Sequence, residues 1–124
     1  LFAGGPVGRN HAIALARVPG RPPEGFTPLD ASRPATGAAL GLLDLTREPA
    51  AYPPLDGLRL FDGHAGWSPG QLEAEVANDA WFVVTARPRD PFTPDPAALW
   101  AAVLRRQPLD LAIFHNFPDE VTQN

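Results

Sequence analysis

The residues best suited to chemistry lie in one run, Gly63 to Gln71, where a short apolar pattern leads into glycines and then a helix start. Backbone N–H groups at a helix start favour a negative charge, so phosphate is one candidate ligand. The run lacks the lysine of a phosphate-binding P-loop and the glycine spacing of a dinucleotide fingerprint. The alternative is that its glycines serve turn geometry and close packing. The candidate binding residues are Gly63, His64, Gly66, Trp67, Ser68, Gly70 and Gln71.

Nucleophilic and metal chemistry find little support in the sequence. The chain has no cysteine, which excludes disulfides, thiolate zinc sites and a cysteine nucleophile. Its three histidines, His11, His64 and His115, have no partner at a metal-ligand spacing. His64 stands near Ser68, but Ser68 is better explained as a helix cap than as a nucleophile. We therefore assign no catalytic residue, no metal and no cofactor.

Periodicity and capping predict the elements that hold this run. Strands are expected at 12–18, 40–45, 58–61, 81–85 and 109–114, with proline-rich connectors between several of them. Ser68, Pro69 and Gln71 suit the N-cap, the first helical position and the capping-box partner of a helix that ends at 78–79. Leu72 and Val76 lie one turn apart and are expected to face inward.

A second helix is expected from Asp95 and Pro96 to about residue 107. Leu99, Trp100, Val103 and Leu104 form its apolar stripe. Arg105 and Arg106 could meet phosphate, but at a helix C-terminus they more simply complement the dipole. Trp67, Trp81 and Trp100 are interpreted as core anchors, because each can bury a large area.

Composition indicates one globular α and β domain. The chain has 124 residues, 44% of them hydrophobic, and no apolar run long enough for a membrane helix. It has ten arginines, no lysine and a formal net charge of −4, which weighs against non-specific binding of nucleic acid. A local cluster of Arg9, Arg17 and Arg21 would restore that possibility. The absence of cysteine fits a cytoplasmic protein.

Three segments carry a resemblance to a known family. They are the opening Leu1-Phe2-Ala3-Gly4-Gly5-Pro6-Val7, the run Arg59 to Glu73, and Trp81 followed by Phe92 and Leu99-Trp100. In order and spacing they resemble the bacterial YqgE/AlgH family, over nearly the whole chain. His64 stands where that family usually has an aromatic residue, and Leu15 is not followed by the histidine that many members have there.

The resemblance implies an α+β fold, a mixed β-sheet flanked by helices, in a single YqgE/AlgH-like domain over residues 1–124. The family's N-terminal segment is missing, and the chain contains no methionine, so we expect the domain to be N-terminally incomplete. The resemblance implies no established activity, although members are often labelled transcriptional regulators.

Two classes of function remain open. The first is a non-enzymatic binding or regulatory module, whose Gly63–Gln71 loop engages a protein partner or a small anionic ligand. The second is an enzyme of unknown reaction, with His64 as acid or base. A structural subunit of a homo-oligomer is a third possibility. Because the sequence shows no group of residues in a catalytic arrangement, we favour the binding module.

Overall fold

The computed structural model describes residues 1–29 and 37–108. The chain divides into two compact units, Leu1–Ala80 and Trp81–Asn124, and each is described by itself. No helix in the described ranges is both long and apolar enough to cross a bilayer. The single domain expected from the sequence stays a prediction.

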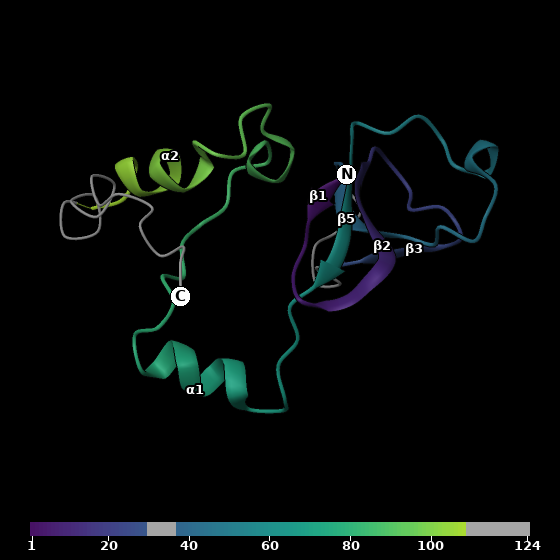
Figure 1. Ribbon diagram of the computed structural model, residues 1–124. Helices are drawn as coiled ribbons and strands as arrows, with labels where there is room; N and C mark the ends of the chain where they lie inside the picture. The colour runs from purple at the N-terminus through teal and green to yellow at the C-terminus, as the bar shows by residue number, and fades with distance from the viewer. Residues whose placement is uncertain (30–36, 109–124) are drawn as a thin grey trace. The chain divides into compact units, whose positions relative to one another are not determined.

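The first unit is built on a five-stranded mixed sheet in the order β1-β5-β2-β4-β3 (Figure 1). Strand β1 runs parallel to β5, and the other neighbours are antiparallel. Together with helices α1 and α2, this sheet gives the α+β fold that the sequence predicted. The strands are β1 Phe2–Ala3, β2 Val7–Val18, β3 Phe26–Pro28, β4 Ala39–Leu43 and β5 Gly57–His64.

The core lies on one face of β2, where small residues alternate with half-buried ones. Ala14, Ala16 and Val18 are fully enclosed, and Phe26 and Leu43 pack against them from β3 and β4. Small side chains are needed on this face of β2 because larger ones, such as the Phe26 ring, pack directly against it. The strands predicted at 12–18 and 58–61 are confirmed, and β2 and β5 extend beyond those bounds. The strand predicted at 40–45 is present as β4 but ends at Leu43.

The connector between β4 and β5 closes this core through a tyrosine. It contains the 3-10 helix η1, Pro49–Ala51. The Tyr52 hydroxyl donates a hydrogen bond of 2.7 Å to the Asp44 carbonyl oxygen, and its ring packs against the buried cluster. A proline-rich segment without regular structure therefore still contributes to the core.

Strand β3 forms one edge of the sheet. The Leu29 N–H donates to the Leu40 carbonyl, and the Gly25 carbonyl accepts from the Asp44 N–H. The backbone groups of Leu29 and Gly25 therefore point toward β4, into the sheet. Because backbone groups alternate in direction along a strand, those of Phe26 and Pro28 point away from β4, toward the open edge of the sheet. The Phe26 N–H is used by the Pro23 carbonyl at 3.3 Å, and proline has no N–H.

Helix α1, Gln71–Ala77, begins later than predicted. Gly70 is its N-cap residue, at φ +78°, and the Ser68 hydroxyl makes no capping bond, so that prediction was wrong. The other half of the expected capping box is present: the Gln71 side-chain oxygen accepts from the Ser68 N–H at 3.0 Å. Leu72 and Val76 are each 36% exposed, so they do not face inward as expected.

The second unit contains no strand in its described part, 81–108. The segment 81–85 was predicted as a strand and has no regular structure. Aromatic and β-branched residues favour strands by packing on paired neighbours, and no described strand pairs with this segment. The strand predicted at 109–114 and His115 lie outside the described residues.

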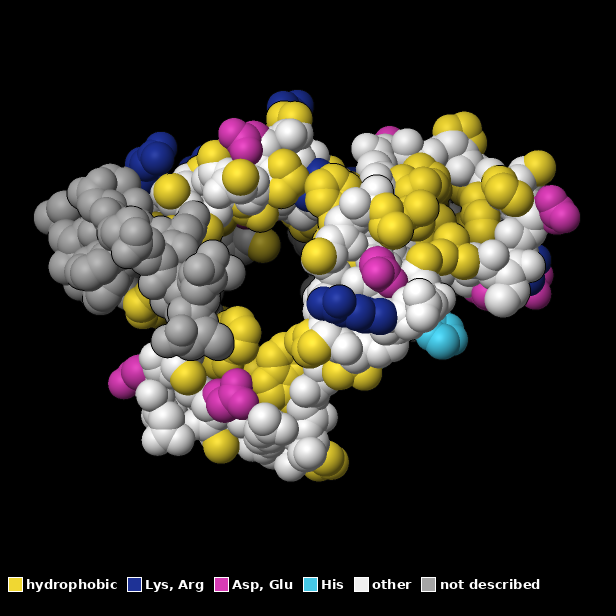
Figure 2. Space-filling model, in the orientation of Figure 1, with side chains coloured by type: hydrophobic (Ala, Val, Ile, Leu, Met, Phe, Trp, Pro, Cys, Tyr) yellow, Lys and Arg dark blue, Asp and Glu magenta, His cyan; other side chains and the backbone are white. Residues whose placement is uncertain are grey.

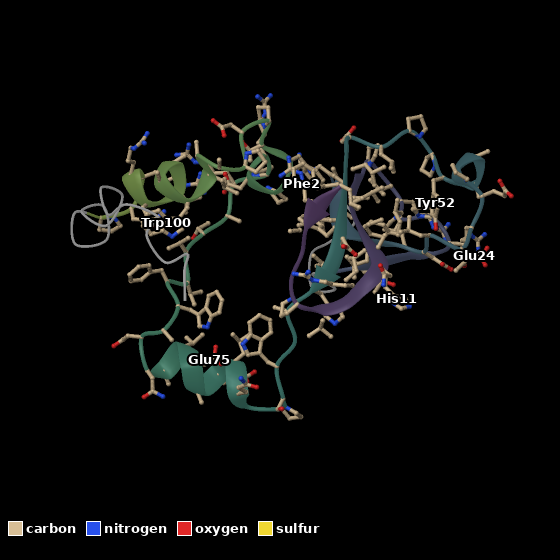
Figure 3. The ribbon with its side chains drawn as sticks, viewed as in Figure 1. Phe2, His11, Glu24, Tyr52, Glu75 and Trp100 are labelled. Atoms are coloured by element: carbon tan, nitrogen blue, oxygen red, sulfur yellow. The ribbon has the colours of Figure 1, made fainter. Side chains whose placement is uncertain are left out.

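In its described part, the second unit contains helix α2, Leu99–Arg105, and the 3-10 helix η2, Asp90–Phe92. The Asp95 carboxylate accepts from the Ala98 N–H at 3.2 Å, the contact expected of a helix cap, although regular helix begins only at Leu99. Leu104 is buried, whereas Trp100 is 45% exposed and lies on the α2 surface (Figure 3). Trp67 and Trp81 are also well exposed, so none of the tryptophans is the core anchor that we predicted.

Candidate binding loop

The candidate loop begins where β5 meets the chain's opening residues. The Gly4 N–H donates to the Asp62 carbonyl at 2.8 Å, which continues the β1–β5 pairing. A Cβ added at Gly63 would lie 2.5 Å from the Gly5 carbonyl oxygen, and one at Gly4 would lie 2.0 Å from the Gly63 oxygen. Gly63 also has φ +73°. Two glycine motifs far apart in the sequence therefore meet backbone to backbone, as the packing alternative requires.

His64 lies over an irregular stretch of β2. Val7 pairs with His64 and Ala12 pairs with Asp62, so four residues of β2 bulge opposite a single residue of β5. Asn10 in this bulge has φ +85°, and its N–H donates to the Asp62 carboxylate at 2.9 Å. A Cβ at Gly8 would lie 3.3 Å from the His64 ring, so the imidazole covers the bulge.

The second half of the loop is organised around Glu75, on helix α1 (Figure 3). The Trp67 indole N–H donates to one oxygen of the Glu75 carboxylate at 3.1 Å. The Gln71 amide donates to the other oxygen at 3.0 Å, and its carbonyl oxygen holds the Ser68 N–H. This chain of contacts fixes the indole against the first two turns of α1.

These contacts determine which chemistry the loop supports. The Ser68 N–H and the Gln71 N–H are both used inside the turn, and the Glu75 carboxylate lies beside it. A phosphate would meet few open donors and a negative charge there. In the described ranges, no hydrogen bond joins His64 to Ser68, and no three His, Asp or Glu side chains are grouped to hold a metal.

The arginines do not form the cluster that would favour nucleic acid. Arg9 lies in the β2 bulge, and Arg17 lies eight residues further along the same strand. A separation of eight residues corresponds to about 26 Å along a regular strand. Arg21 follows β2 in the connecting loop. One face therefore does not gather all three guanidinium groups.

Asp44 and Asp90 have lowered pKa values, and both carboxyl groups lie away from the loop. Hydrogen bonds from the Thr46 side chain and backbone hold the pKa of Asp44 below its ordinary value. In the second unit, the Arg106 guanidinium lowers the pKa of Asp90 by donating to both carboxylate oxygens. The same pair raises the pKa of Arg106. Arg106 therefore forms an ion pair, a role that the sequence analysis did not predict when it assigned Arg106 to the helix dipole.

Comparison with known proteins places the chain in a family. A sequence model described as AlgH-like matches residues 1–112. The chain belongs to the AlgH-like family. The match includes both glycine motifs that meet at Gly63, as the resemblance predicted.

Relatives in this family carry names that state no activity. A UPF0301 protein of Streptomyces coelicolor is 44% identical, and one of Mycobacterium leprae is also 44% identical. Both matches include all of this chain, which spans 64% and 60% of those proteins respectively. The crystal structure of protein DIP2367 from Corynebacterium diphtheriae is 34% identical, with a TM-score of 0.76 over 94% of this chain and 60% of that one.

Sequence reasoning treated the two glycine motifs separately and missed their contact. The signal was present: glycines in two distant segments occur in the same family pattern. Glu75 was also missed as the acceptor for Trp67 and Gln71, although its spacing of four from Gln71 places both on one helix face.

Proposed function

We propose that this chain is a non-enzymatic binding module that recognises a protein partner through the face formed by Trp67, Leu72 and Val76. The observation that carries the proposal is the exposure of these three side chains, at 38%, 36% and 36%. In Figure 2 the part that carries α1 shows hydrophobic side chains interspersed with acidic and polar ones. Helix α1 buries none of its own residues.

The geometry of this face suits recognition because its anchor is already held in place. Leu72 and Val76 lie one turn apart, and Trp67 is tied to the adjacent Glu75. Fixing an exposed indole before binding lowers the entropy lost on association. Tryptophans surrounded by smaller apolar contacts often contribute most of the binding energy at protein interfaces. A catalytic role for His64 has no comparable support, since its ring covers the β2 bulge.

If the module is regulatory, it would act through the protein partner that it binds. Such a role does not require a nucleic-acid site on the loop. The net charge of −4 and the carboxylate beside the loop both act against phosphate binding. We therefore favour a protein partner over an anionic ligand. Self-association through the same face would make the partner a second copy.

Photo-cross-linking in the bacterial host tests the proposal. A benzophenone amino acid replaces Leu72, and a matched control replaces Ala74, which is exposed about 200° away around the helix. We expect a discrete cross-linked partner from position 72 and not from position 74. The purified partner should then bind at least about tenfold more weakly to Leu72→Asp. Equal cross-linking from both positions, or none from either, would contradict the proposal.

A further inference from the structure

The described part of the second unit, residues 81–108, carries a net positive charge, although the chain as a whole is acidic. Residues 81–108 contain four arginines and two aspartates, whereas the described part of the first unit has five arginines and eight acidic residues. Figure 2 shows dark blue side chains along the outer edge of the part that carries α2. Charge of opposite sign is therefore separated between the described parts of the two units.

A half-buried ion pair brings these arginines together. Arg106 donates to both oxygens of the Asp90 carboxylate, one of them at 2.9 Å, and both side chains are about one-sixth exposed. The Arg87 backbone N–H donates to the same carboxylate at 2.7 Å. This carboxylate therefore joins the segment 87–90 to the C-terminal end of α2.

Three arginines around this ion pair remain exposed, and we define them as the arginine patch: Arg87, Arg89 and Arg105. Arg89 directly precedes Asp90, and Arg105 directly precedes Arg106. Within the described residues, none of the three side chains makes an ion pair. Because Arg106 already occupies the Asp90 carboxylate, the patch has an excess of positive charge with no ion-pair partner among the described residues.

We infer that the arginine patch binds an acidic segment of a protein partner, with carboxylates pairing to its exposed guanidinium groups. The Asp90–Arg106 pair shows the same two-bond geometry within the chain, and guanidinium forks match carboxylates in this way. Trp100, exposed on α2, offers an apolar contact in the same unit. The inference rests on the proposed function and assigns a second, charged surface to the binding module.

The size of the patch favours a peptide over a nucleic acid. A protein that binds nucleic acid through its backbone makes about six to ten phosphate contacts, and three arginines would supply about a third to a half of them. A short acidic segment can bind through only a few ion pairs, and electrostatic attraction also raises its association rate modestly.

Fluorescence anisotropy tests the inference on the full chain. The probes are a fluorescein-labelled twelve-residue peptide of glutamates with two leucines, its glutamine counterpart, and a single-stranded twenty-nucleotide RNA. We expect the acidic peptide to bind at 50 mM salt, its Kd to rise several-fold at 200 mM, and the glutamine peptide to bind at least about tenfold more weakly.

The variants locate the site. Replacing Arg87, Arg89 and Arg105 by glutamine should raise the Kd about tenfold, since each exposed pair contributes modestly. The matched control replaces Arg9 and Arg21, which are equally exposed in the first unit, and should change the Kd less than twofold. Circular dichroism checks folding, and the three single variants assign the loss if the triple variant is unfolded.

Three outcomes overturn the inference: equal losses in the patch and control variants, tighter binding of RNA than of the peptide, or no peptide binding at 50 mM salt. None of these bears on cross-linking from position 72. Failure of the arginine patch is therefore distinguishable from failure of the proposed function.

Discussion

Three glycines of the candidate loop have different roles at the scale of single residues. Two observations require glycine at position 63. Its φ is +73°, and an added Cβ would lie 2.5 Å from the Gly5 carbonyl oxygen. Gly70 is required by its left-handed backbone at the start of α1, where a Cβ would meet nothing within 4 Å. Gly66 meets neither requirement. Only the first of these glycines holds the β5 end against the opening segment.

Substitution of Gly63 by alanine should therefore destabilise the protein by about 3 kcal/mol, because strain and overlap add. Urea unfolding followed by tryptophan fluorescence measures this. Gly66→Ala is the matched control, and its free energy of unfolding should lie within about 0.5 kcal/mol of the parent. Similar losses in both variants would show that the close contact does not determine stability.

Residue roles were predictable from sequence only where the local chain decides them. The glycine-rich turn and the Ser68–Gln71 contact are local, and both were found. The exposure of Trp67 depends on what covers α1, which a residue's size cannot reveal. The position of Glu75 beneath the indole likewise needs the path of the loop.

At the scale of elements, the strand at 12–18 was predictable from the alternation of its residues. The face that it buries, with Ala14, Ala16 and Val18, was not predicted, because these small side chains give a weak hydrophobic signal. The segment 81–85 has equally strong strand composition, but no described neighbour pairs with it. Strand formation depends on a partner that composition does not encode, which explains why one prediction was confirmed and the other was wrong.

The ion pair between η2 and α2 should make the stability of the second unit depend on pH. The pKa of Asp90 is lowered in the folded state, so its contribution is complete above the unfolded value, about 3.9, and is lost as the pH falls through the folded value. Asp90→Asn should lower the thermal midpoint at pH 7 by about 5 °C. Below pH 3 the difference from the parent should shrink.

The matched control for this prediction is Asp79→Asn. Asp79 is exposed and has φ +57°, a backbone region that asparagine also adopts. Thermal melts followed by circular dichroism at pH 7, 5 and 2 compare the three proteins. A midpoint difference for Asp90→Asn that stays constant with pH would exclude the ion pair as its cause.

At the scale of the whole molecule, the chain links two compact units at Ala80 and Trp81. Trp81 and Phe82 are 49% and 45% exposed and lie in a segment without regular structure, whereas Phe26 is only 8% exposed. Proteases cut exposed, irregular backbone first. Chymotrypsin should therefore cleave after Trp81 or Phe82 and leave the sheet unit intact.

Time-resolved mass spectrometry of the digest checks this division. We expect an early fragment that ends at residue 81 or 82, and replacement of both aromatic residues by serine should remove it. Early cleavage after Phe26 or Phe61 would mean that the sheet opens more readily than the link. Either fragment pattern also decides whether residues 1–124 behave as the single domain expected from the sequence.

The edge formed by β3 has a consequence for polymerisation. Its two outward positions offer no open N–H, because Phe26 uses its own and Pro28 has none. A strand from another molecule would find acceptors there but no donors from β3. Edge-to-edge pairing through β3 is therefore disfavoured, which protects this side of the sheet against growth into fibrils.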